Sequence, residues 1–191
     1  MILIMTGPLT DLARALRIDP LLQEKIECLY WMGGSLDGHG NVNELGFDGT
    51  AEWNAFWDPE AVQTVFNSDL KIQMVGLEST EEIPLTKELR LHWAQNRCYP
   101  AIDLIGQGYS LVLADEADST YYLWDMLTTL SSLYPELVTT EMTKAAVSVT
   151  GSSAGRTYLT STGRSLNLVT KANKQQFFEL FDWLAQSAVL K

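Results

Sequence analysis

The segment Ile2-Leu3-Ile4-Met5-Thr6-Gly7-Pro8 combines a strand pattern with a tight turn. Residues 2–6 form the continuous apolar run that is typical of a buried strand in a parallel sheet. Gly7-Pro8 turns the chain, and apolar residues then recur at helical spacing through Arg17. A strand, a turn and a helix in this order indicate an α/β protein.

The same alternation continues along the chain. Further strands are predicted at 25–32, 72–75, 138–149, 156–159 and 166–170. Helices are predicted at 58–66, 84–95, 99–114, 123–133 and 177–190, and residues 33–51 are predicted to form a long loop. Asp58-Pro59-Glu60 starts its helix well, with Asp at the N-cap and Pro at the first helical position. We therefore expect a mainly parallel α/β sheet with flanking helices and a small mixed β appendage near the C-terminus. We expect residues 1–191 to form a single domain.

Composition excludes several classes of protein. The chain has 191 residues, of which 46% are hydrophobic, so one domain with a sizeable core is expected. A net charge of −11 argues against nucleic acid or anionic membrane as a partner. No apolar run approaches the roughly 20 residues that span a bilayer. Cys28 and Cys98 are too few for a disulfide framework, so we expect reduced thiols and a cytoplasmic protein.

A group of polar residues indicates a binding site. Glu52-Trp53-Asn54 follows Asn41 by eleven residues. In an extended segment, positions i and i+2 point to the same face, so Glu52 and Asn54 would present a carboxylate and an amide side by side. These groups suit a polyhydroxylated ligand such as a sugar, since each hydroxyl both donates and accepts hydrogen bonds.

The order of several motifs resembles the nucleoside hydrolase family. These are Thr6-Gly-Pro-Leu-Thr, Met32-Gly-Gly, Gly-Asn41, Glu52-x-Asn54, Asp58-Pro-Glu-Ala and Trp124-Asp125. The resemblance implies a Rossmann-like α/β fold and hydrolysis of ribonucleosides to base and ribose. It also implies that Met32, Asn41, Glu52 and Asn54 contact the ribose, and that Asp125 and the Thr6 carbonyl bind Ca²⁺.

The residue at position 124 distinguishes branches of the family by the base that they prefer. Many members carry His at this position, whereas in the purine-specific, inosine–adenosine–guanosine-preferring branch a Trp stacks on the base. The eleven-residue spacing from Asn41 to Glu52 and the presence of Trp53 favour the same branch. By this resemblance the substrate is a purine ribonucleoside.

The sequence departs from the family in one respect. The Asp-x-Asp-x-x-x-Asp-Asp cluster, which supplies the other calcium ligands and the catalytic base, does not occur in this chain. Since calcium takes six to eight oxygens, we expect an incomplete metal site and negligible hydrolysis by the isolated chain. The chain would then lack the family's N-terminal strands, and the apolar edge of Ile2–Met5 would be covered by self-association or by a partner chain.

Each residue also has a simpler interpretation. Trp124 on an apolar helix is more often a core residue, and Asp125 a solvated helix residue. Glu52 and Asn54 alone would be ordinary loop polars. The alternative function is a non-catalytic domain that binds ribose or nucleoside, or that completes a split enzyme. Residues 96–121 flank Trp124 and could close over the pocket.

Overall fold

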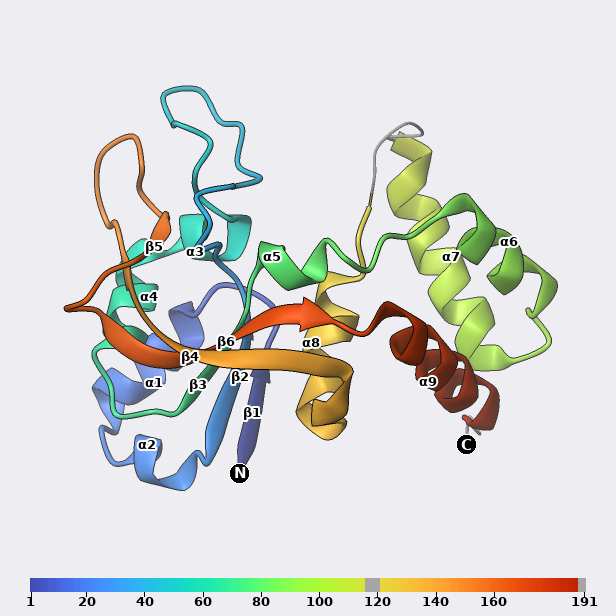
Figure 1. Cartoon of the computed structure of the whole chain (residues 1–191), viewed down its shortest axis with the longest axis horizontal. Helices are drawn as coiled ribbons and strands as arrows, with labels where there is room; N and C mark the ends of the chain where they lie inside the picture. Colours follow the sequence, from blue (N-terminus) through green and yellow to red (C-terminus); the bar gives the residue numbers. More distant parts are fainter. Residues whose placement is uncertain (116–120, 189–191) are drawn as a thin grey trace.

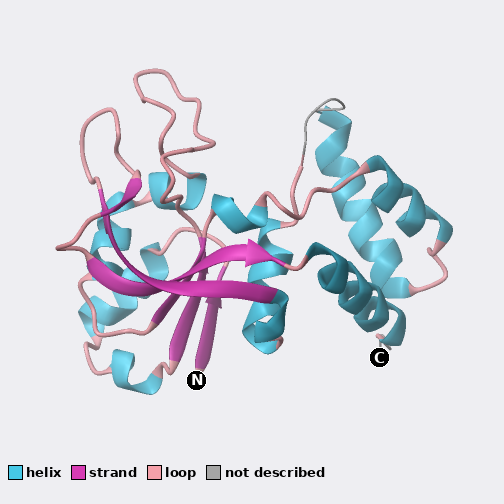
Figure 2. Cartoon of the chain, in the orientation of Figure 1, coloured by secondary structure: helices cyan, strands magenta, loops and turns pink. Residues whose placement is uncertain are grey.

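The computed structural model describes residues 1–115 and 121–188. Its strands form one six-stranded sheet in the order β1-β2-β3-β6-β4-β5 (Figures 1 and 2). The strands are β1 (Ile2–Met5), β2 (Cys28–Met32), β3 (Ile72–Val75), β4 (Val138–Val147), β5 (Thr157–Leu159) and β6 (Arg164–Ala172). β1, β2, β3 and β6 run parallel, while β4 pairs antiparallel with β6 and β5. The mixed α/β class predicted from the sequence is confirmed. The C-terminal strands continue the main sheet rather than forming a separate appendage, because β6 pairs directly with β3.

The helices include every predicted one in the predicted order, together with three short helices, at Leu22–Lys25, Trp53–Trp57 and Leu77–Thr80, that were not predicted. They are α1 (Thr10–Ile18), α2 (Leu22–Lys25), α3 (Trp53–Trp57), α4 (Pro59–Phe66), α5 (Leu77–Thr80), α6 (Lys87–Gln95), α7 (Pro100–Asp115), α8 (Trp124–Leu133) and α9 (Lys174–Ser187), with the 3₁₀ turn η1 (Pro135–Leu137). Asp58 caps α4 by accepting a hydrogen bond from the backbone N–H of Ala61. α1 and α4 pack together, and α8 packs on β1 and β2. Residues 116–120, part of the segment 96–121, lie outside the described residues.

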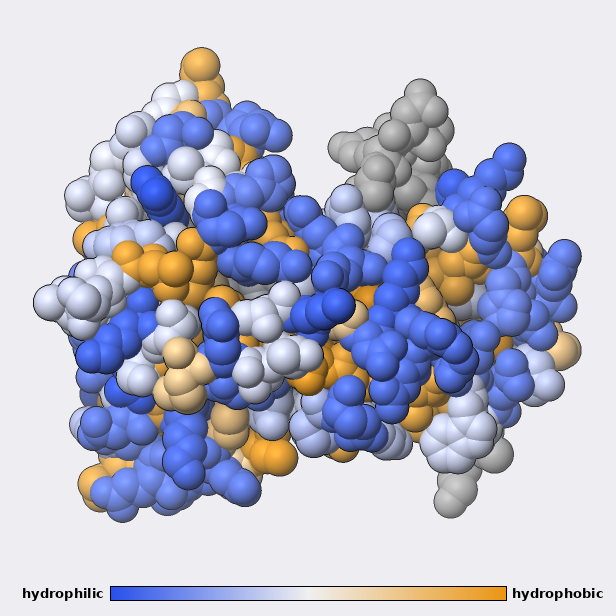
Figure 3. All heavy atoms as spheres, viewed as in Figure 1, coloured by the Kyte–Doolittle hydropathy of each residue, from blue (hydrophilic) through white to orange (hydrophobic). Residues whose placement is uncertain are grey.

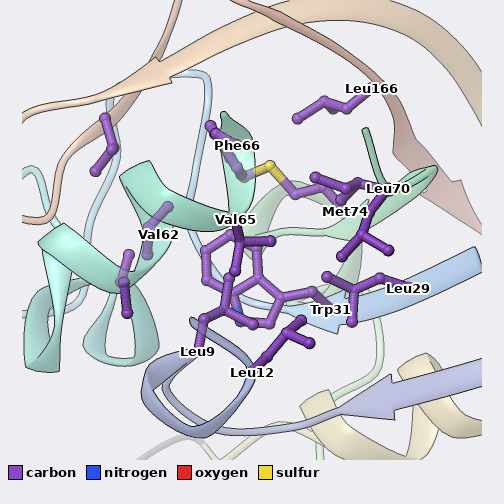
Figure 4. Close-up of a cluster of buried hydrophobic side chains, with 14 of the residues drawn as sticks. Leu9, Leu12, Leu29, Trp31, Val62, Val65, Phe66, Leu70, Met74 and Leu166 are labelled. Carbon is purple, nitrogen blue, oxygen red and sulfur yellow. The ribbon is translucent and has the colours of Figure 1, made fainter. Parts of the chain in front are cut away.

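One hydrophobic cluster joins α1 and α4 to the sheet (Figure 4). The buried Trp31 indole lies among Leu9, Leu12 and Val65 in this cluster and meets the Phe66 ring edge-to-face at 6.1 Å. Its Nε1 donates a hydrogen bond of 3.2 Å to the carbonyl of Gly7. The core thereby fixes the turn that follows β1.

A second cluster joins α6, α7, α8 and α9 to the end of the sheet. Buried Trp93 of α6 packs against Phe181 of α9 and Tyr109 of α7, with ring centroids 5.6 and 5.8 Å apart. α6, α7 and α9 lie together beyond the sheet in Figure 1. The face seen in Figure 3 is mainly hydrophilic, with hydrophobic residues in scattered patches. No helix in the described ranges is both long and apolar enough to cross a bilayer.

Candidate active site

A cavity of about 190 Å³ lies at the carboxyl ends of β1 and β2. It is lined by Thr6, Met32, Asn41, Glu52, Trp53, Asn54, Trp124 and Asp125. Thr6 follows β1 and Met32 ends β2, and in parallel α/β sheets ligands bind beyond such strand ends. The structure therefore brings all seven residues selected from the sequence to one cavity, together with Trp53.

The Glu52 carboxylate holds the backbone around this cavity through hydrogen bonds. Its side chain is buried, and Oε2 accepts hydrogen bonds from the backbone N–H groups of Gly34 (2.8 Å), Asn54 (3.0 Å) and Ala55 (3.2 Å). Oε1 shares only the N–H of Asn54, at 3.0 Å. Burial is the largest influence on this carboxyl and raises its pKa from 4.5 to about 7. The backbone hydrogen bonds oppose that shift, and the nearby Asp125 charge adds to it.

The expectation that residues 52–54 are extended is wrong. Glu52 is the N-cap of α3, and Asn54 lies inside the helix. The Glu52 carboxylate accepts from the first N–H groups of α3, which otherwise lack a partner, and so favours a helix at this position. The helix also explains why Trp53 lines the cavity. In an extended segment Trp53 would point to the face opposite Glu52, so sequence reasoning used it as a branch marker and missed it as a site residue.

Two amides are held in place by hydrogen bonds to the backbone. Asn54 Nδ2 donates to the carbonyl of Met32 at 3.0 Å. Asn41 Oδ1 accepts from the backbone N–H of Trp53 at 3.1 Å, which ties the long loop to the start of α3. One end of each amide is therefore hydrogen-bonded to the backbone. The other end makes no hydrogen bond to any residue in the described ranges. These free ends are an amide oxygen on Asn54 and an amide N–H group on Asn41.

Trp124 lies at the first turn of α8, within a group of aromatic rings. The Tyr121 ring meets it edge-to-face at 4.6 Å, and the Tyr122 ring lies 5.7 Å away. Trp53 contributes a second indole to the cavity lining. Trp124 is partly exposed, so it is not solely a core residue. A flat apolar ligand would find an aromatic wall here.

Asp125 and Thr6 are the oxygen donors that the sequence assigns to calcium. Both line the cavity and both are exposed, and desolvation by neighbouring residues raises the pKa of the Asp125 carboxyl. Glu52 does not add to this set, since its side chain is buried and three backbone N–H groups occupy Oε2. No group of three or more acidic, His or Cys side chains able to hold a metal occurs among the described residues. Two oxygens do not fit a calcium shell of six to eight.

The fold and the cavity together define an α/β protein with a small polar pocket at its parallel strand ends. A sequence model of the inosine-uridine preferring nucleoside hydrolase family matches residues 1–179, and the chain belongs to that family. A probable uridine nucleosidase 2 from Arabidopsis thaliana is 30% identical over 156 residues, covering 80% of this chain and 47% of the relative.

Solved structures of nucleoside hydrolases share the fold. An inosine-uridine preferring nucleoside hydrolase from Bacillus anthracis superposes with a TM-score of 0.91 at 43% identity, covering 98% of this chain and 61% of that chain. A purine-preferring ribonucleoside hydrolase from Gardnerella vaginalis superposes with a TM-score of 0.77 at 26% identity, covering 97% and 61%. The chain thus spans about half the length of the curated relatives it matches and about three fifths of these structures.

Proposed function

We propose that this chain forms the ribose- and base-binding part of a nucleoside hydrolase that cleaves the N-glycosidic bond of purine ribonucleosides. The observation that carries this proposal is the convergence of Asn41, Glu52 and Asn54 with Trp124 around one cavity. A carboxylate and two amides with free ends suit the hydroxyls of ribose, and Met32 lines the same wall. Contacts of this kind accelerate a reaction when they strengthen in the transition state.

The choice of purine rests on Trp124. An indole has no acidic proton to give a leaving base at neutral pH, but its face offers a stacking surface for a purine. The names of the relatives do not favour one base, since they include a uridine nucleosidase and a purine-preferring hydrolase. Trp124 within its aromatic group is therefore the feature that supports the purine proposal.

The described residues of the isolated chain lack several of the oxygen ligands that a calcium site needs. Asp125 and the Thr6 carbonyl are proposed calcium ligands, and they leave the shell incomplete. We therefore propose that the residues of this chain by themselves hydrolyse nucleosides negligibly, and that the remaining oxygen ligands come from outside them. The residues proposed to bind ribose and base line one cavity, so nucleoside binding should persist without turnover. The free thiols of Cys28 and Cys98 support the proposed cytoplasmic location.

Two assays test this function. Ribose release from inosine and from uridine, each with and without calcium, should be negligible for the isolated chain. Calorimetry should show that inosine binds more tightly than uridine and that Glu52→Gln weakens the binding, while Asn43→Ala in the exposed part of the loop leaves it unchanged. Calcium-dependent turnover by the chain alone would contradict the proposed limit. Failure to bind any nucleoside would contradict the proposed function and its non-catalytic alternative, a ribose- or nucleoside-binding domain.

A further inference from the structure

A pocket lies between α6 and α7, which contact each other beyond the sheet (Figure 1). Its volume is about 390 Å³, which is within the range of small-molecule sites in proteins. It is lined by Arg90 and Trp93 of α6, Tyr109 of α7 and Arg97 of the turn between them, among others. Among the described residues, it shares no lining residue with the cavity around Glu52. This α6–α7 pocket is therefore a separate candidate site.

One wall of the α6–α7 pocket is aromatic. The Trp93 indole and the Tyr109 ring lie 5.8 Å apart, with 33° between their planes. Phe181 of α9 packs on the other side of this group, 5.6 Å from the indole, and Trp93 is only 2% exposed. The core therefore fixes the position of the indole. A wall of this kind suits the flat ring of a ligand.

Two arginines place positive charge at the pocket, although the chain carries a net charge of −11. Arg97 Nε donates to Asp103 Oδ1 at 2.5 Å, and the other Asp103 oxygen accepts from Gln107 at 2.7 Å. The terminal nitrogens of Arg97 and the guanidinium group of Arg90 make no hydrogen bond to the described residues. Two guanidinium groups against one carboxylate leave an excess of one positive charge in the lining.

The aromatic wall also carries hydrogen-bond donors. Trp93 Nε1 is buried and has no acceptor among the described residues. Buried donors are nearly always paired with protein, water or a ligand, so this N–H calls for an acceptor. Burial raises the pKa of Tyr109 to about 12, so its phenol keeps the proton at neutral pH and can donate as well. The lining therefore favours a ligand that brings acceptors.

We propose that the α6–α7 pocket binds a small aromatic carboxylate, a flat ring that carries one ionised carboxyl group. The carboxylate accepts hydrogen bonds from Arg90, Arg97 and the Trp93 N–H, and the ring packs along the wall that Trp93 and Tyr109 form. One negative charge matches the one excess positive charge, and an arginine fork fits the two oxygens of a carboxylate. None of the residues proposed to hold a nucleoside takes part, so this inference does not rest on the proposed function.

Two other kinds of ligand fit the lining less well. Inorganic phosphate has no apolar part to cover the aromatic wall, so it would use only the arginines. A neutral nucleoside has a ring for the wall but leaves both guanidinium groups without an anion. The combination of an aromatic wall and a cationic end is what favours a ring with a carboxylate.

Indole-3-carboxylate is the probe, and calorimetry measures its binding to the full 191-residue chain at neutral pH. Indole-3-carboxamide has nearly the same shape without the charge, and inorganic phosphate has charge without a ring, so these two are the control ligands. We expect the carboxylate to bind at least about tenfold more tightly than either control, which corresponds to about 1.4 kcal/mol.

Variants place the probe in the pocket. Arg90→Gln and Arg97→Gln should each weaken its binding about fivefold, because each removes charge-assisted hydrogen bonds. Arg14→Gln is the matched control, since Arg14 is exposed on α1 and does not line the pocket, and it should have no effect. Inosine should not displace the probe, because the pocket and the cavity around Glu52 are separate.

Nuclear magnetic resonance of ¹⁵N-labelled tryptophan reports the buried donor directly. The Trp93 Nε1–H resonance, assigned through Trp93→Phe, should move downfield when the probe supplies an acceptor. The resonance of Trp183, which is 60% exposed on α9, is the internal control and should not move. A Trp93 resonance that stays in place at saturating probe would overturn the proposal.

The calorimetric outcomes are equally decisive. The proposal is overturned if the carboxamide or phosphate binds as tightly as the probe, or if millimolar probe gives no binding heat. Equal losses in Arg14→Gln and Arg97→Gln, or displacement of the probe by inosine, would place the probe elsewhere and overturn it too. Failure of inosine to bind while the probe still binds contradicts only the proposed function.

Discussion

Glu52 Oε2 lies 2.8 Å from the backbone nitrogen of Gly34 and accepts its hydrogen bond. The two positions are 18 apart in the sequence, and nearly all of the residues between them form the long loop that carries Asn41. This contact joins the two ends of the loop. The same carboxylate also caps α3, so one side chain holds the backbone that surrounds the cavity. Changes at Glu52 should therefore affect both stability and ligand binding.

Protonation of Glu52 should make stability depend on pH. Its pKa is raised from 4.5 to about 7, so the folded chain holds the proton more tightly than the unfolded chain. The resulting stabilisation is complete below pH 4.5 and is lost as the pH rises through about 7. The loss should approach about 3 kcal/mol of unfolding free energy. Urea unfolding across this pH range measures it.

Glu52→Gln is the matched variant for this effect. A glutamine carbonyl in the position of Oε2 can still accept from Gly34, Asn54 and Ala55, so the variant should fold. Its unfolding free energy should lack the Glu52 part of the pH dependence, since the amide does not titrate. An unchanged pH dependence in Glu52→Gln would assign the effect to other acids.

Asn41→Ala should destabilise the chain by about 1–2 kcal/mol, because the amide oxygen of Asn41 accepts the N–H of Trp53 and the variant leaves that donor unpaired. Chemical denaturation measures the change. Asn43→Ala is the control, since Asn43 is an exposed residue of the same loop. Equal effects of the two substitutions would show that the Asn41 hydrogen bond is not what holds the loop.

Gly34→Ala should be far more damaging than Gly38→Ala. Both glycines have positive φ angles, 73° and 88°, so both variants carry backbone strain of about 1–2 kcal/mol. At Gly34 an added Cβ would also lie 2.5 Å from Met74 Cε and 2.6 Å from Thr157 Oγ1, whereas at Gly38 nothing lies within 4 Å. Thermal unfolding should show Gly34→Ala costing roughly 1–3 kcal/mol more, through overpacking. Similar melting temperatures would refute the steric argument.

Trp124→Ala should weaken purine nucleoside binding by about 1–3 kcal/mol, the typical value of stacking one base on an aromatic ring. Uridine binding should change less, since a pyrimidine has a smaller face. Calorimetry with inosine and uridine measures both. Trp183→Ala is the control, because Trp183 is 60% exposed on α9 and does not line the cavity. An equal loss for both nucleosides would remove Trp124 as the basis of purine preference.

Much of the fold was predictable because its signals are local. The apolar run at residues 2–6 gave β1, and Asp58-Pro59 gave the start of α4, since strand burial and helix capping depend on a few neighbouring residues. The prediction that residues 52–54 are extended was wrong for a physical reason. Glu52 caps α3 only because it is also buried against Gly34, and the alternation rule applied to this segment does not contain that long-range contact.

The sequence by itself determined the order of the strands and of the longer helices, the family, and the residue types able to hold a sugar and a base, because local periodicity and collinear motifs carry these signals. The tertiary structure alone decided that Thr6 and Asp125, more than a hundred residues apart, line one cavity. It alone revealed Trp53 in that lining, and an apolar groove between α7, α8 and α9 that shares Thr6 and Asp125 with the cavity. These features arise when parallel strands and helices pack, and packing joins residues whose separation along the chain carries no signal of their proximity.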